Sequence, residues 1–214
     1  MASKKSYLKE KNLPVVILFV IWCLSLYATF VAGSGSFWAD LQGNYKLLEK
    51  KNGIVVTMMP VLILVVSGLV SSHVKACLVF WRVKDPLPGH RAFTKLAPRD
   101  ARIDMRDLRS KLGTVPRSSK EQNTCWYKIY KRFEALPLVE NPHRSFLLAR
   151  DLAAISIIFS IGGALGMLAV GVNTKHVALY FGLMICHYLL LALVARNHGN
   201  RLVCNVIVEY LGCD

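Results

Sequence analysis

Apolar positions in this chain are gathered into four long blocks, which run over residues 13–32, 54–80, 146–170 and 177–195. Each block is close to the roughly 20 residues that an α-helix needs to cross a bilayer. Charged residues are concentrated outside the blocks. This segregation predicts an all-α membrane protein with four transmembrane helices.

The polar segments divide the rest of the chain. Residues 1–12 and 196–214 form the ends, residues 33–53 and 171–176 are short connections, and residues 81–145 form one long connection between the second and third spans. The first apolar block is longer than the ~7–15 apolar residues of a secretory signal, and no small-residue cleavage site precedes Gly33. We therefore expect a retained first helix, and a small helical domain in residues 81–145.

Charge fixes the expected orientation. The chain holds 27 Lys and Arg residues against 13 Asp and Glu, and sixteen of the 27 lie between Arg82 and Arg150. In a soluble protein this excess would suggest nucleic-acid binding, but in a membrane protein basic residues accumulate in cytoplasmic loops. We expect both termini and residues 81–145 to lie in the cytoplasm. We expect the membrane that the spans cross to be the bacterial inner membrane.

The second block carries a polar stripe. At 100° per residue, four side chains fall within about a quarter-turn of each other: Thr57, Ser67, Ser71 and Lys75. A polar stripe on a spanning helix faces protein or water, so these residues are candidates for lining a pore in an oligomer. The alternative is that the small residues pack helix against helix while Lys75 extends to the headgroups.

The third block has a clear start signal. Asn141 is the expected N-cap and Pro142 the first helical residue, after which the helix can continue to Val170. Gly162 and Gly166 form a G-x-x-x-G motif, which permits close helix packing within the chain or between subunits.

The fourth block contains one ionisable residue, His187, close to the expected bilayer midplane. An ionisable group at that depth is a candidate for an ion or proton path, and the alternative is a neutral imidazole hydrogen-bonded to a neighbouring Ser or Tyr. Residues 196–214 are too short to cross again. We expect them to extend the fourth helix or to lie against the domain of residues 81–145.

Two helices are expected within residues 81–145. Asp100 can cap a short helix that Gly113 ends, with three arginines on one face: Arg102, Arg106 and Arg109. Ser118 and Glu121 form a capping box for a second helix. On this helix an aromatic and apolar face (Trp126, Ile129, Tyr130 and Phe133) lies opposite a basic face (Lys128, Lys131 and Arg132).

These basic residues are candidates for binding an acidic ligand, a soluble partner, a nucleotide or nucleic acid, or anionic headgroups. The alternative for the arginines is pairing with nearby aspartates and glutamates. Because the aromatic residues point away from the cations, base stacking beside phosphate contacts is disfavoured.

The sequence carries no Gly-rich phosphate loop, catalytic triad pattern, paired catalytic carboxylates or H-E-x-x-H motif. Its six cysteines and six histidines lie scattered, without the spacing of metal ligands. We therefore expect a non-enzyme without cofactor or bound metal.

The leading functional hypothesis is an oligomeric membrane protein that forms or gates an ion-conducting path under the control of its basic cytoplasmic domain. In architecture, the chain resembles the small multi-span membrane effectors of bacterial anti-phage systems, which implies that a cytoplasmic signal would open the membrane part. The alternative is a membrane scaffold or sensor that recruits a soluble partner and conducts nothing. A transporter is disfavoured because the two pairs of spans show no internal repeat.

Overall fold

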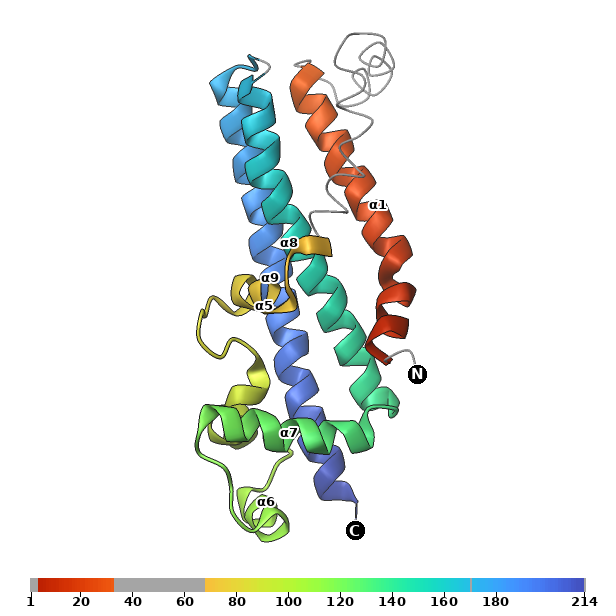
Figure 1. Cartoon of the computed structure of the whole chain (residues 1–214), viewed down its shortest axis with the longest axis vertical. Helices are drawn as coiled ribbons and strands as arrows, with labels where there is room; N and C mark the ends of the chain where they lie inside the picture. Colours follow the sequence, from red (N-terminus) through yellow and green to blue (C-terminus); the bar gives the residue numbers. More distant parts are fainter. Residues whose placement is uncertain (1–3, 33–67, 170, 214) are drawn as a thin grey trace. The chain divides into compact units, whose positions relative to one another are not determined.

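The computed structural model describes residues 4–32, 68–169 and 171–213 (Figure 1). Within these ranges every regular element is a helix, which confirms the all-α prediction. Three helices are long and apolar enough to cross a membrane: α1 (Lys4–Ala32), α8 (Pro137–Ala169) and α9 (Thr174–Gly212). Their length and composition indicate a membrane location.

The second apolar block is only partly described, since residues 54–67 lie outside the described ranges. In the described part, the helix is interrupted at Val70 and Ser71, and α5 (Ser72–Phe80) begins after the break. Ser71 caps α5, because its Oγ accepts from the backbone N–H of Val74 at 3.2 Å and its carbonyl accepts from that of Lys75 at 3.1 Å. The predicted span over residues 54–80 thus contains a break in its described part, and a fourth span stays a prediction.

The third apolar block begins earlier than its sequence signal indicates. The helix α8 starts at Pro137, so that Pro142 lies inside it, and the predicted start at Asn141 is wrong. At the other end, Gly171 has a φ of 78°, and the N–H groups of Gly171 and Val172 bond the carbonyls of Leu168 and Met167. This pair of bonds is a Schellman motif, which requires the left-handed backbone that glycine adopts without strain.

The helix α9 continues without a break through the fourth apolar block and the C-terminal segment to Gly212. Asn173 caps its start, with its side-chain oxygen 2.9 Å from the backbone nitrogen of Lys175. The segment after residue 195 thus extends the fourth helix, as one of the two expectations had it.

The chain divides into two compact units. The first, here called the apolar unit, consists of Met1–Lys75 and Arg150–Leu191. Its core joins side chains from α1, α8 and α9, namely Val20, Cys23, Leu26, Tyr27, Ile155, Phe159, Met167, Val177, Tyr180 and Met184. Tyr180 is fully buried, packs edge-on against Tyr27, and donates a hydrogen bond to the Phe159 carbonyl at 3.1 Å.

The second unit, here called the basic unit, consists of Ala76–Ala149 and Ala192–Asp214. It contains three short helical turns, η1 (Pro88–Arg91), η2 (Ala92–Leu96) and η3 (Ala97–Arg99), and two α-helices, α6 (Met105–Leu112) and α7 (Ser119–Phe133). Its core includes Phe93, Ile103, Leu108, Ile129, Tyr130 and Val139 together with Leu202, Val203, Val206 and Ile207 of α9. The C-terminal segment therefore also packs against the residues that precede α8, so both sequence-based expectations for it hold.

Candidate functional site: a hollow in the basic unit

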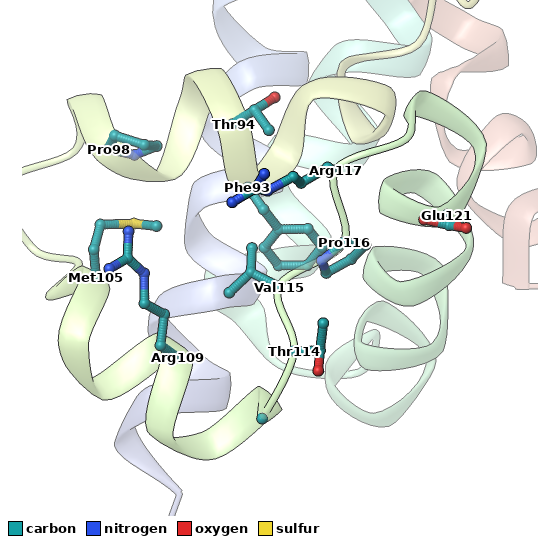
Figure 2. A pocket seen from close by; sticks show the side chains of 11 residues that line it. Phe93, Thr94, Pro98, Met105, Arg109, Thr114, Val115, Pro116, Arg117 and Glu121 are labelled. Atoms are coloured by element: carbon teal, nitrogen blue, oxygen red, sulfur yellow. The ribbon is translucent and has the colours of Figure 1, made fainter.

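The basic unit contains a hollow of about 900 Å³ between η2, η3, α6 and the start of α7 (Figure 2). Its apolar lining comes from Phe93, Pro98, Met105, Val115 and Pro116, and its polar lining from Thr94, Arg109, Thr114, Arg117 and Glu121. This volume lies within the range of sites that hold small molecules or the side chains of a bound peptide.

Local sequence signals form the hollow's walls. The helix α6 begins at Met105 because Asp104 caps it, with Oδ1 accepting from the Arg106 backbone N–H at 2.6 Å, and it ends at Gly113, whose φ is 68°. The end at Gly113 was predicted, but the cap was predicted at Asp100, which is wrong. The start of α7 follows the predicted capping box, since the Ser118 Oγ accepts from the Glu121 backbone N–H at 3.3 Å.

Gln122 holds the wall of the hollow in place. Its side-chain oxygen accepts from the backbone N–H groups of Phe93 and Thr94, each at 3.2 Å, and from the Thr94 hydroxyl at 3.1 Å. Its amide nitrogen donates to the Arg117 carbonyl at 2.9 Å. Gln122 is only 2% exposed, and this one buried side chain bonds three backbone groups, those of Phe93, Thr94 and Arg117. Sequence reasoning missed it, because Gln122 follows the capping box without any motif of its own.

The charges at the hollow are of both signs. Arg109 comes from the last turn of α6, and Arg117 from the segment before α7, with Glu121 in the first turn of α7. All three side chains are exposed, and none forms an ion pair with another described residue. The hollow thus presents an apolar surface with two guanidinium groups and one carboxylate available at its edge.

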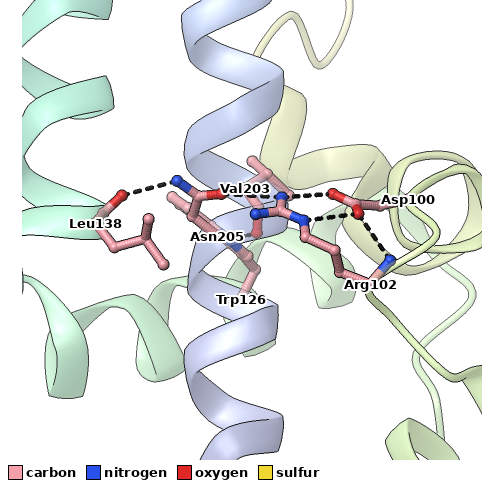
Figure 3. A network of polar contacts seen from close by, with 6 residues as sticks. All are labelled: Asp100, Arg102, Trp126, Leu138, Val203 and Asn205. Atoms are coloured by element: carbon pink, nitrogen blue, oxygen red, sulfur yellow. Dashed lines mark hydrogen bonds and ion pairs between the residues drawn. The ribbon is translucent and has the colours of Figure 1, made fainter.

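Arg102, the first of the three predicted arginines, has a structural role. It precedes α6 and therefore does not share a helix face with Arg106 and Arg109. Its Nε and Nη2 donate to the Asp100 carboxylate at 2.9 and 2.7 Å, and Nη2 also donates to the Asn205 side-chain oxygen at 3.0 Å (Figure 3). These hydrogen bonds from Arg102 lower the pKa of Asp100 from 3.8 to about 2.

Asn205 links this network to α8. Its side-chain amide donates to the Leu138 carbonyl at 2.8 Å (Figure 3). In an unbroken helix that carbonyl would accept from the backbone N–H of residue 142, but Pro142 has none. Asn205, which is fully buried, supplies the missing donor, and this explains how α8 can begin at Pro137 and continue through Pro142.

The other predicted basic residues are exposed. The Arg106 side chain lies on the surface of α6, and Lys128, Lys131 and Arg132 lie on the exposed face of α7. Lys131 forms an ion pair with Glu134 at 2.9 Å. The opposite face of α7 packs inward through Ile129 and Tyr130, as the periodicity predicted. Burial raises the pKa of the Tyr130 hydroxyl, which lies 3.0 Å from the His143 Nδ1.

The pore candidates that lie in the described residues have different local environments. Thr57 and Ser67 lie outside the described residues, and Ser71 is the α5 cap. The His187 Nδ1 lies 3.1 Å from the Leu183 carbonyl of its own helix, so its polar contact within the described part of the chain is with backbone.

Lys75 lies beside an acidic residue that sequence reasoning did not connect with it. Its Nζ is 3.3 Å from the Asp151 carboxylate, which Arg150 also contacts at 2.9 Å. The side chains of Lys75 and Arg150 are 8% and 4% exposed and that of Asp151 is 18% exposed, so the three charges form a largely buried cluster in the apolar unit. The available signal was the Arg150–Asp151 pair beside an apolar run, since charges in such a run are costly unless paired.

The glycines of the G-x-x-x-G motif face different surroundings. A Cβ at Gly166 would lie 3.0 Å from the Tyr27 hydroxyl oxygen, so α8 closely approaches α1 there. At Gly162 a Cβ would meet open space. The close contact between α8 and α9 occurs instead at Gly163, where a Cβ would lie 2.5 Å from the Tyr180 hydroxyl oxygen.

Comparisons with known proteins add no assignment, because no family model matches the sequence and neither the curated proteins nor the solved structures give a match. Among the described residues, no three His, Cys, Asp or Glu side chains are grouped as metal ligands would be. The hollow and the charged clusters are therefore the features of the chain that bear on function.

Proposed function

We propose that this chain is a membrane-anchored scaffold whose basic unit binds an acidic segment of a soluble partner in the hollow beside α6. The observation that carries the proposal is the pairing of an apolar lining with Arg109 and Arg117, two exposed guanidinium groups without ion-pair partners among the described residues. An apolar anchor of the partner would pack against Met105 and Val115, while its carboxylates would pair with the two arginines.

The mixed charge of the hollow favours a protein segment over a nucleotide. Glu121 would repel a polyphosphate, whereas it can accept hydrogen bonds from a peptide. Phe93 is 1% exposed, so it offers no open ring on which a base could stack. A nucleotide that bound here would therefore lack a stacking contact for its base, and its phosphates would meet Glu121 beside the two arginines.

The proposal is tested with the full chain in neutral detergent and a fluorescent peptide that combines glutamates with one aromatic anchor, read by anisotropy. Replacing both Arg109 and Arg117 by Gln should weaken binding at least about tenfold, since each charge-assisted hydrogen bond contributes about 1.5–3 kcal/mol before screening by water. Arg99→Gln is the matched control, because Arg99 is an exposed arginine of the same unit that does not line the hollow.

Peptide affinity that is equal in the double variant and the wild type would remove the hollow from the binding site. A neutral peptide of the same length that binds equally well would show that charge does not contribute. Affinity for ATP that is higher than for the acidic peptide, and that depends on the same arginines, would replace the scaffold by a nucleotide sensor.

A second candidate function is an ion-conducting path in an oligomer, controlled by the basic unit. The observation that favours it is the largely buried cluster of Lys75, Arg150 and Asp151 in the apolar unit, since ionisable groups beside spanning segments often line ion paths. Purified protein in dye-loaded liposomes should then leak ions, and Asp151→Asn should change the leak. Liposomes that stay tight with and without the acidic peptide would favour the scaffold alone.

A further inference from the structure

Three arginines of the basic unit gather around the aromatic residues that end α5. The Arg196 guanidinium lies 3.5 Å from the centre of the Trp81 ring, and its Nε donates to the Val79 carbonyl. The Arg91 guanidinium lies 5.8 Å from the centre of the Phe80 ring. Arg82 follows these aromatics directly in the chain, so all three cations belong to one small region.

One guanidinium nitrogen of Arg91 lacks a hydrogen-bond acceptor in this region. Its Nη1 is buried and has no hydrogen-bond partner in the described part of the chain. Burial, together with repulsion from Arg82 and Arg196, lowers the pKa of Arg91. A buried guanidinium nitrogen without an acceptor, held beside like charges, is unfavourable by itself and becomes favourable when an anion binds there.

The neighbouring acid is engaged elsewhere. Asp85 lies within electrostatic range of Arg82, but a hydrogen bond from Ser119 is the main cause that lowers the pKa of its carboxyl. Asp85 also lies 3.8 Å from the His90 ring nitrogen. The carboxylate of Asp85 is thus held by Ser119 and lies near His90, and the Nη1 of Arg91 has no acceptor among the described residues.

The position of the cluster along the chain indicates what anion it meets. Trp81 and Arg82 directly follow the expected second span, and Arg196 directly follows the expected fourth span. In the expected orientation both points lie at the cytoplasmic surface of the membrane. Exposed tryptophan, here 53% exposed, is favoured at headgroup depth, and basic clusters at this surface attract anionic lipids.

We propose that Arg82, Arg91 and Arg196 bind a phosphate group, supplied by the headgroup of an anionic phospholipid in the cytoplasmic leaflet. The phosphate oxygens accept hydrogen bonds from the guanidinium groups, including the buried Arg91 Nη1, and relieve the repulsion among the three cations. Trp81 stays stacked under Arg196 and holds that guanidinium at the level of the headgroup.

The test uses native mass spectrometry of the full chain released from neutral detergent, titrated with phosphatidylglycerol or with phosphatidylcholine. The first phosphatidylglycerol should bind at least about tenfold more tightly than phosphatidylcholine. Arg82→Gln and Arg91→Gln should each weaken phosphatidylglycerol binding about fivefold, the effect of roughly one basic residue near a membrane surface. Arg99→Gln, an exposed arginine outside the cluster, should leave it unchanged.

A second measurement separates loss of the site from misfolding. Without lipid, Arg91→Gln should keep or raise the thermal unfolding midpoint in detergent, because it removes a buried charge from a like-charged cluster. A lowered midpoint would show that Arg91 already has a compensating interaction in the protein, and would overturn the proposal.

Titrations with the two lipids and with inorganic phosphate distinguish the source of the phosphate group. Equal affinity for the two lipids, or phosphatidylglycerol affinity unchanged in both Gln variants, would overturn the site. Inorganic phosphate that displaces phosphatidylglycerol at millimolar concentration and depends on the same arginines would support a phosphate site and overturn the lipid as its source.

Discussion

Asn205 donates to the Leu138 carbonyl in place of the backbone N–H that Pro142 lacks, so these two distant positions should be energetically coupled. Asn205→Leu removes the side-chain donor and keeps the number and branching of the side-chain heavy atoms. Pro142→Ala restores the backbone donor and makes the Asn205 amide redundant for α8. A double-mutant cycle between these two changes measures the coupling.

The magnitude follows from the two hydrogen bonds of the fully buried Asn205 side chain, at 2.8 Å to the Leu138 carbonyl and 3.0 Å from Arg102. Each bond of this kind contributes about 1 kcal/mol, so Asn205→Leu should lower the free energy of unfolding by about 2 kcal/mol. The bond from Arg102 is lost in either background and cancels in the cycle. Only the Leu138 bond depends on residue 142, which gives an expected coupling of about 1 kcal/mol.

The assay is equilibrium unfolding of the purified chain in mixed detergent micelles, followed by circular dichroism. Pro137→Ala is the matched control, because Pro137 is the first residue of α8, where no N–H is needed, and its cycle with Asn205→Leu should show no coupling. Additivity of Pro142→Ala and Asn205→Leu within about 0.3 kcal/mol would refute the replacement of one donor by the other.

Two further predictions concern packing and charge. Gly163→Ala should lower the free energy of unfolding by about 1–3 kcal/mol, because its Cβ would lie 2.5 Å from the hydroxyl oxygen of the buried Tyr180. Gly162→Ala should cost nothing, since its Cβ meets open space. Thermal unfolding in micelles measures both effects. The pKa of Asp100 lies at about 2 instead of 3.8, so its carboxylate stabilises the fold above pH 3.8. This contribution is lost as the pH falls toward 2. Asp100→Asn should therefore flatten the decline of the unfolding midpoint between about pH 4 and 2.

Equal destabilisation by alanine at the two glycines would show that the Tyr180 contact does not limit the approach of α8 to α9. An acid-induced decline that is as steep with asparagine at position 100 as with aspartate would show that other carboxyl groups account for it.

Sequence reasoning succeeded where the cause was local. Gly113 ends α6 and Ser118 caps α7 because each acts on backbone groups within four residues of itself. The inward face of α7 was likewise readable, since the burial of Ile129 and Tyr130 follows from the helical period.

It failed where the cause was distant along the chain. Asp100 and Asp104 are equally good caps by composition, and Asp100 is instead paired with Arg102, which also donates to Asn205. Asn141–Pro142 is a proper helix-start signal, but Asn205 compensates for the proline and allows an earlier start. For the candidate site, the sequence indicated Arg109 among the basic residues but not the hollow, because the hollow depends on how Gln122 fixes η2.

The packing of Leu202 to Ile207 into the core of the basic unit has a consequence for the order of events during synthesis. The residues that surround this core, from Ala92 to Val139, are translated well before α9 is complete. Their core cannot close until the chain has passed both long apolar helices and residues 202–207 have emerged. The basic unit should therefore mature only after α8 and α9 have been synthesised, so that a chain that stops before residues 202–207 would also lack a closed core and a finished hollow.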